Sequence, residues 1–123
     1  MSNTIGKVGW MDLTVDDALG LKDFYSKVVG WKADPVSMGD YCDFNMCVDG
    51  VPVGGICHAK GTNAGIPAQW MMYVTVDDID RCVAEASAAG GTVVHTVKTK
   101  QDHLSVAFIK DPAGAHFALY QAQ

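Results

Sequence analysis

An internal repeat limits the folds open to this chain. The pentapeptide LTVDD at residues 13–17 recurs as VTVDD at residues 74–78. Each copy follows a strand-like run and precedes a stretch with helical periodicity. In the first of these stretches, the residues expected on the buried helix face are Ala18, Leu21, Phe24, Tyr25 and Val28. The second aspartate of each copy, Asp17 or Asp78, is a good helix N-cap, and glycines at 30 and at 90–91 provide the usual helix stop. The repeat therefore predicts two similar modules, each of which opens with a strand and a helix.

Three strand-like runs follow each predicted helix. In chain order they are residues 31–37, 41–48 and 51–58, and then residues 92–99, 103–110 and 115–120. Turn signals join the last two runs of each set, Asp49-Gly50 in the first half and DPAG at residues 111–114 in the second. These runs predict an α+β fold of two βαβββ modules, residues 8–58 and 69–121, with residues 59–68 as a linker. A half of about 60 residues is small for a stable core, so we expect the halves to pack as a single domain over residues 1–123.

Charge and composition disfavour several kinds of partner. The formal net charge is −5, and the nine Lys and Arg residues are scattered along the chain. Such a chain repels nucleic acid phosphates and anionic lipid. The first residues lack an apolar signal segment, no apolar run is long enough to span a bilayer, and the four cysteines form no C-x-x-C pair. We therefore expect a cytoplasmic protein with reduced thiols that binds neither nucleic acid nor membrane.

Several landmarks, in their order along the chain, resemble the glyoxalase/bleomycin-resistance/extradiol dioxygenase (vicinal oxygen chelate) superfamily. They are VDD at residues 15–17, Phe24-Tyr25, Gly30-Trp31 and the closing DPAGAHF at residues 111–117. The resemblance implies that two βαβββ modules place their sheets side by side as a U-shaped trough, with the helices outside. In that family the trough binds metal and substrate, and many members are homodimers. By resemblance, we expect a homodimer that binds a small molecule.

Alternation along the strands predicts which side chains face this trough and which face a helix. Trp70 is expected on the helix side, and Trp31 where the first helix meets the second strand. The side chains expected on the trough face, strand by strand, are Trp10, Asp12 and Thr14; Tyr41, Asp43 and Asn45; Pro52, Gly54 and Ile56; Met71, Tyr73 and Thr75; and His116, Ala118 and Tyr120.

The resemblance also implies where a metal would bind. Metal-using members of the family take one ligand from each of four strands, and the corresponding positions in this chain are Trp10, Gly54, Met71 and Ala118. None of these side chains offers the oxygen or imidazole donor that a divalent cation needs. A shift of two residues in the fifth strand would add Gln69, but one ligand does not make a site. We therefore expect no metal and no other cofactor.

The leading functional hypothesis is a small-molecule-binding protein of the bleomycin-resistance type that has lost the usual metal site. Its mainly apolar trough would hold the ligand without chemical conversion. The expected ligand contacts are Trp10, Thr14, Tyr41, Asp43, Met71 and Tyr120.

The alternative hypothesis is an enzyme, a lyase or isomerase acting on a small carbonyl compound. Asp12 lies in the middle of a strand, and a desolvated carboxylate there would suit proton transfer. Asp12 would act as the base and His116 or Tyr73 as the acid. A third hypothesis is a metalloenzyme with a rearranged site that uses His116, Asp12 or Gln69.

Overall fold

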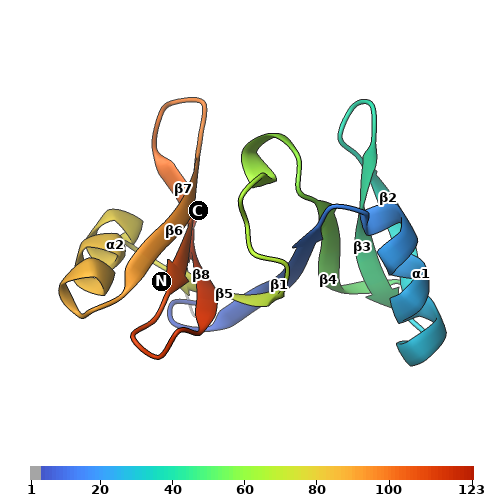
Figure 1. Ribbon diagram of the computed structural model, residues 1–123, viewed down its shortest axis with the longest axis horizontal. Helices are drawn as coiled ribbons and strands as arrows, with labels where there is room; N and C mark the ends of the chain where they lie inside the picture. The colour runs from blue at the N-terminus through green and yellow to red at the C-terminus, as the bar shows by residue number, and fades with distance from the viewer. Residues whose placement is uncertain (1–3) are drawn as a thin grey trace. The chain divides into compact units, whose positions relative to one another are not determined.

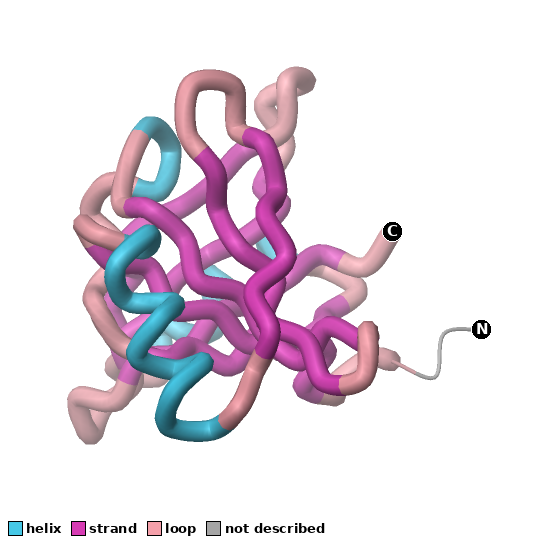
Figure 2. The backbone as a smooth tube through the Cα atoms, turned by 90° about the vertical axis from the view of Figure 1, so that its right-hand side faces the viewer, coloured by secondary structure: helices cyan, strands magenta, loops and turns pink. Residues whose placement is uncertain are grey.

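The computed structural model describes residues 4–123, which fall into two compact units. Unit 2 is residues 11–70, and unit 1 combines residues 71–123 with the segment that ends at Trp10. Each unit carries one α-helix on its strands (Figure 1), and strands predominate over helices along the chain (Figure 2). The boundary falls inside β1 (Val8–Val15), so the two units share the first strand.

Unit 2 contains α1 (Ala18–Val29) and strands in the order β2-β3-β4-β1. Its other elements are β2 (Lys32–Ser37), β3 (Cys42–Val48), β4 (Val51–His58) and the short 3-10 helix η1 (Gly61–Asn63). β2, β3 and β4 pair antiparallel, whereas β1 pairs parallel with β4. These strands agree within one residue with the predicted runs, but η1 lies inside the predicted linker and was not expected.

Unit 1 repeats the same element order. It contains β5 (Trp70–Val76), α2 (Ile79–Ala88), β6 (Thr92–Lys98), β7 (Leu104–Lys110) and β8 (His116–Gln121). The strand order is β5-β8-β7-β6, with β5 and β8 parallel and the remaining pairs antiparallel. The predicted α+β class and the repeated βαβββ order are therefore confirmed.

The repeated aspartates begin both helices, as the sequence predicts. Asp17 Oδ1 accepts a hydrogen bond of 2.9 Å from the backbone N–H of Gly20, and Asp78 Oδ1 accepts one of 3.1 Å from that of Arg81. At the other end of α1, Gly30 adopts a left-handed conformation with φ 77°. A residue with a side chain is strained there, so the glycine stop has a steric cause.

Each unit has its own apolar core beneath its helix. The buried residues are Ala18, Phe44, Met46 and Ile56 in unit 2, and Val76, Ile79, Ala107, Ile109 and Leu119 in unit 1. Trp70 packs into the unit 2 core, where its indole N–H donates a 2.9 Å hydrogen bond to the Tyr25 hydroxyl. Tyr25 also stacks on Trp31 at 5.8 Å between ring centroids. The expected positions of Trp70 and Trp31 are thus confirmed.

The structure corrects the predicted side-chain directions in β4. Gly54 pairs with Met46 and Ile56 pairs with Phe44, and Ile56 is buried in the core beneath α1. A β-bulge shifts the register next to Met46, so that the following β3 residue pairs with Pro52. The extra residue in β4 inverts the alternation beyond it. Gly54 and Ile56 consequently face α1, whereas unbroken alternation placed them on the opposite side.

The structure also corrects the predicted buried face of α1. Helical spacing grouped Phe24 and Val28 with the buried residues, but they are 53% and 63% exposed. Ala18, which is fully buried, and the partly buried Tyr25 mark the centre of the face that packs on β3 and β4. No helix in the described part of the chain is long and apolar enough to span a membrane.

Candidate functional site

The helix-free face of unit 1 is the side of its sheet opposite α2. Leu119 is buried in the core beneath α2, so its neighbours Ala118 and Tyr120 in β8 point to the helix-free face. Across the parallel pairing with β5, Tyr73 lies beside Ala118 and Thr75 lies beside Tyr120. These directions agree with the strand alternation read from the sequence.

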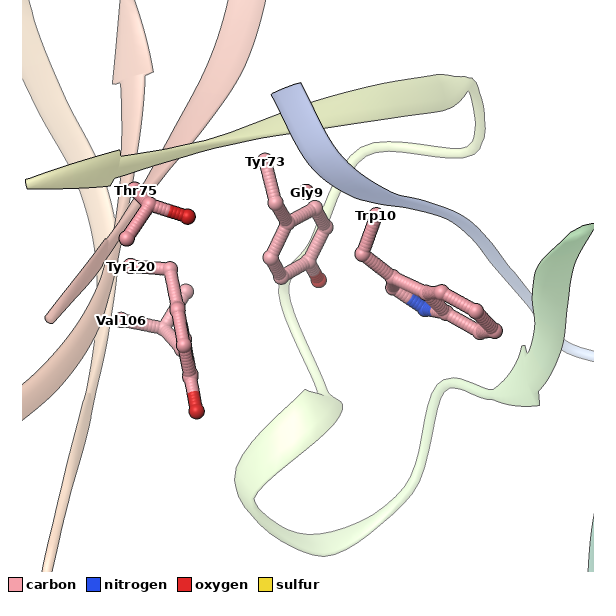
Figure 3. Close-up of a pocket in the computed structure, with 6 residues that line it drawn as sticks. All are labelled: Gly9, Trp10, Tyr73, Thr75, Val106 and Tyr120. Carbon is pink, nitrogen blue, oxygen red and sulfur yellow. The ribbon is translucent and has the colours of Figure 1, made fainter. Parts of the chain in front are cut away.

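A hollow of about 380 Å³ opens on this face, and we call it the aromatic hollow. Its lining residues are Gly9, Trp10, Tyr73, Thr75, Val106 and Tyr120. The rings of Trp10, Tyr73 and Tyr120 extend in the same direction from three strands (Figure 3). None of the lining side chains is Asp, Glu, Lys, Arg or His. The volume is in the range of small-molecule pockets, and such rings combine apolar faces with hydrogen-bonding edges.

Neighbouring groups hold two lining residues of the aromatic hollow, Tyr73 and Thr75, in place. Tyr73 meets Phe108 edge to face, with ring centroids 5.8 Å apart, and Phe108 meets His95 at 5.9 Å. Phe108 is 2% exposed, so the ring that Tyr73 contacts is itself fixed by the packing around it. On the other side, Thr75 is fixed by backbone hydrogen bonds with the segment before β1.

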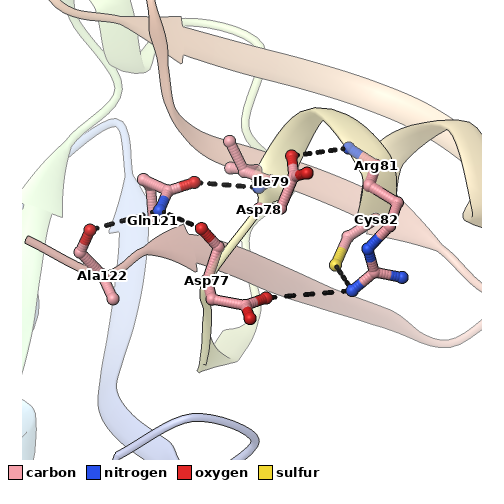
Figure 4. Close-up of polar contacts among 7 residues, drawn as sticks. All are labelled: Asp77, Asp78, Ile79, Arg81, Cys82, Gln121 and Ala122. Atoms are coloured by element: carbon pink, nitrogen blue, oxygen red, sulfur yellow. Dashed lines mark hydrogen bonds and ion pairs between the residues drawn. The ribbon is translucent and has the colours of Figure 1, made fainter. Parts of the chain in front are cut away.

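The residue after Tyr120 ties β8 to the start of α2 (Figure 4). Gln121 Oε1 accepts a 2.8 Å hydrogen bond from the backbone N–H of Ile79, and its Nε2 donates one of 2.7 Å to the carbonyl of Asp77. The amide thus pairs with one of the N–H groups at a helix start that have no partner within the helix. The position of Tyr120 in β8 is thereby coupled to the packing of α2.

Unit 2 has a separate polar cluster formed by Asp12, Asp43, Cys57 and His58. Asp43 is 6% exposed, and its Oδ1 accepts a 2.8 Å hydrogen bond from the His58 N–H and lies 3.3 Å from His58 Nδ1. Burial raises the pKa of the Cys57 thiol well above its ordinary value, and the Asp12 and Asp43 carboxylates raise it further. The thiol is therefore held neutral and is a poor nucleophile.

An aromatic and a cationic side chain extend this polar cluster. The Tyr41 ring contacts the His58 ring edge to face at 5.3 Å, and the Lys60 ammonium lies 4.7 Å from the centre of the Tyr41 ring. The structure therefore brings Asp12 and Asp43 together through Cys57, and brings Tyr41 to Asp43 through His58.

The predicted site residues are divided between the two units. Two of the predicted contacts, Trp10 and Tyr120, line the aromatic hollow together with Tyr73, which was predicted as a catalytic acid. Met71 and Thr14 are 1% and 3% exposed, and neither lines that hollow.

The residues of the predicted acid–base set are divided in the same way. Asp12 belongs to unit 2, whereas Tyr73 and His116 belong to unit 1. His116 pairs with Lys110 at the start of β8 and is not among the residues that line the aromatic hollow.

Sequence reasoning missed four residues of these two sites. Gly9 and Val106 line the aromatic hollow, and Cys57 and His58 belong to the polar cluster. Val106 pairs with Tyr120 across β7 and β8, so alternation along β7 could have found it once the pairing was known. No sequence signal could have placed Cys57 in the polar cluster, because the direction of its side chain depends on the bulge between β3 and β4.

The four metal-ligand positions do not fit a divalent cation. A side chain at Gly54 would meet the Met11 carbonyl oxygen at 3.0 Å and the Trp70 ring at 3.5 Å, so this position faces the unit 2 core. Its neighbour Gly55, which pairs with Asp12, has no side chain either. Trp10, Met71 and Ala118 provide no oxygen or imidazole donor. Across residues 4–123, no group of three His, Cys, Asp or Glu side chains is arranged to hold a metal.

Comparison with known proteins identifies the family. The model of the Glyoxalase-like domain family matches residues 10–120. This chain belongs to the glyoxalase-like family. A putative glyoxylase of Mycobacterium bovis, CFP32, is 33% identical over 120 residues, which are 95% of this glyoxalase-like chain and 46% of the relative. The anthracycline biosynthesis protein DnrV of Streptomyces peucetius is 31% identical over 131 residues, covering 94% of this chain and 47% of the relative. The chain therefore spans about half the length of these curated relatives.

Solved structures support the same fold for this glyoxalase-like protein. A glyoxalase/bleomycin resistance protein/dioxygenase superfamily member from Vibrio splendidus 12B01 matches with a TM-score of 0.55 and 16% identity, over 92% of this chain and 97% of that chain. Methylmalonyl-CoA epimerase from Mycobacterium tuberculosis matches with a TM-score of 0.55 and 16% identity, over 100% of this chain and 93% of that chain. At this identity the likeness establishes the fold alone. The resemblance read from the sequence is confirmed.

Proposed function

We propose that this glyoxalase-like chain is a small-molecule-binding protein whose ligand occupies the aromatic hollow, and that the usual metal site of the family is lost. The presence of three aromatic side chains, Trp10, Tyr73 and Tyr120, in the lining of one uncharged hollow carries the proposal. Such a surface binds an apolar, planar compound through the ring faces and orients it through the phenol hydroxyls. Thr14, Tyr41, Asp43 and Met71 stay predicted contacts, and a cytoplasmic homodimer stays the expected setting.

Replacing Trp10 tests this proposal. A library of planar aromatic compounds is screened by ligand-observed NMR, and hits are titrated calorimetrically against the wild type and Trp10→Ala. The library includes tetracyclic quinones, because two relatives are named for anthracycline biosynthesis. Truncating a Trp at the centre of a binding surface typically costs 2 kcal/mol or more, so we expect roughly a thirtyfold loss of affinity.

Val51→Ala provides the matched control, because Val51 is 61% exposed at the β3–β4 turn and lines none of the described hollows. It should bind every hit as the wild type does. Hits whose affinity is the same in Trp10→Ala as in the wild type would place the binding surface elsewhere and overturn the proposal.

A second candidate function, lyase or isomerase chemistry on a small carbonyl compound, rests on Asp12. Its carboxylate and that of Asp43 both act on the Cys57 thiol, so two acidic groups gather on one side of the unit 2 sheet. The test is solvent deuterium exchange at the carbon next to the carbonyl in a panel of small ketones and aldehydes. A general base contributes about 10²- to 10⁴-fold in rate, so Asp12→Asn should abolish any exchange that Asp12 catalyses. For a pure binder, the same substitution should leave ligand affinity within a few-fold.

A further inference from the structure

A second hollow adjoins the aromatic hollow within unit 1. Its volume is about 360 Å³, and it shares Gly9, Thr75 and Tyr120 with the aromatic hollow. The other residues that line it are Thr4, Lys7, Val8, Ala122 and Gln123. We call it the Lys7 hollow. Because three residues border both hollows, one elongated molecule could occupy both.

Among the side chains that line the two hollows, the charge is confined to the Lys7 hollow. Lys7 carries the only Lys, Arg, Asp, Glu or His side chain among the residues that line the two hollows. The chain as a whole has a formal net charge of −5, so a lysine side chain beside the aromatic hollow is a local exception. A cation at one end and three aromatic rings at the other match a ligand with an anionic group and an aromatic body.

The backbone fixes Lys7 relative to the hollows. The Lys7 carbonyl accepts a 3.0 Å hydrogen bond from the Thr75 N–H, and the Gly6 N–H donates one of 2.7 Å to the Thr75 carbonyl. Gly6 has φ 83°, a conformation that suits glycine. The Lys7 side chain therefore starts from a defined point beside Thr75, which borders both hollows, although its end is exposed.

Gly9 stands where the two hollows meet. A Cβ at this position would lie 3.0 Å from Thr75 Oγ1, so any side chain would press on a residue that both hollows share. Tyr120, also shared, is 36% exposed, and its ring points away from β8 with the hydroxyl at the outer end (Figure 3). The absence of a side chain at Gly9 thus keeps space at the point where an elongated ligand would cross.

We propose that the ligand is an elongated aromatic carboxylate, with its ring system in the aromatic hollow and its carboxylate beside Lys7, joined by a short flexible linker. This inference rests on the proposed function and specifies its ligand class. The ring binds through apolar contact, and Lys7 favours the anionic compound over neutral analogues of the same shape. An exposed ion pair contributes modestly, so Lys7 adds selectivity more than strength.

A homologous series of probes tests this inference. The compounds are 2-naphthylacetate, 4-(2-naphthyl)butanoate and 6-(2-naphthyl)hexanoate, each paired with its neutral methyl amide, titrated calorimetrically at about 50 mM salt. One linker length should bind best, and its carboxylate should bind about threefold to fivefold more tightly than its amide. Lys7→Met should remove that difference while the amide keeps its affinity, and Lys7→Arg should preserve it.

Three further comparisons sharpen the test. Lys100→Met removes an exposed positive charge from the β6–β7 loop, which lines neither hollow, so it should leave the preference for the carboxylate intact. Gly9→Ala should abolish the dependence on linker length by narrowing the junction. A phosphate monoester with the best linker tests which anion the Lys7 hollow prefers. If the phosphate binds as tightly as the carboxylate or more tightly, the ligand class is a phosphate and the proposed carboxylate class is overturned.

The outcomes separate this inference from the proposed function. If the amides bind and depend on Trp10 but the carboxylates bind no better, and Lys7→Met changes nothing, then the inference fails while the proposed function stands. If no probe depends on Trp10, both fail.

Discussion

The surroundings of Cys57 strongly alter the chemistry of its thiol. Burial raises the pKa of its thiol, and the Asp12 and Asp43 carboxylates raise it further. Alkylation requires the thiolate, so we expect iodoacetamide at pH 8 to label Cys57 much more slowly than a model peptide thiol. Asp12→Asn and Asp43→Asn should each accelerate labelling by removing a negative charge. Peptide mass spectrometry measures the rates, with the exposed Asp40→Asn as the control. Equal rates in all variants would show that the carboxylates have no influence on the thiol.

The same thiol makes stability depend on alkaline pH. The pKa of Cys57 is higher in the folded than in the unfolded protein, so its contribution is fully present below the unfolded value, about pH 8.5, and declines as pH rises above it. The maximum slope for one group is about 1.4 kcal/mol per pH unit. Between pH 8 and pH 10, the wild type should therefore lose about 1–2 kcal/mol more of its unfolding free energy than Cys57→Ala. Urea denaturation at the two pH values measures this, and parallel losses in the two proteins would contradict it.

Among the elements, β8 and the start of α2 are joined by the hydrogen bonds of one side chain, Gln121. Gln121→Leu removes the hydrogen bonds to the Ile79 N–H and the Asp77 carbonyl while keeping a similar volume. Leaving such partners unpaired costs about 1–3 kcal/mol, which we expect as a loss of unfolding free energy in urea. Gln101→Leu, at an exposed loop position, is the control and should change stability by less than about 0.5 kcal/mol. Equal effects of the two substitutions would mean that the Gln121 amide contributes nothing.

Element order was predictable from the sequence because local signals repeat in it. Each of these signals determines the conformation of only a few neighbouring residues. They are the aspartates that cap both helices, the glycine at 30 and the Asp49-Gly50 turn, and each appears where expected. The β-bulge next to Met46 was not predictable, since alternation is read one strand at a time and a bulge is a property of two paired strands. The exposure of Phe24 on α1 depends on which strands the helix covers, and helical spacing does not contain that information.

At the scale of the whole molecule, the candidate site was only partly predictable. The directions of Trp10, Tyr73 and Tyr120 follow from alternation in strands without bulges, and these residues form the aromatic hollow. The division of β1 between two units could not be inferred, because it arises from contacts with residue 71 onward rather than from any local signal. For the same reason Lys7, which precedes β1 in the sequence, was not recognised as part of a binding surface.

Metal content provides the last whole-molecule prediction. A divalent cation needs several oxygen, imidazole or thiolate donors converging on one point, and Trp10, Met71, Ala118 and either glycine at 54–55 supply none. The protein purified without chelators or an affinity tag should therefore contain less than about 0.1 equivalent of Zn, Ni, Mn or Fe by elemental analysis, and calorimetric titration with each ion should show no saturable site at micromolar concentrations. One tightly held metal per chain or per dimer would contradict this reading of the four positions. A rearranged site using His116, Asp12 or Gln69 would then become the leading hypothesis, and Asp12→Ala and His116→Ala would be the variants to test for loss of that metal.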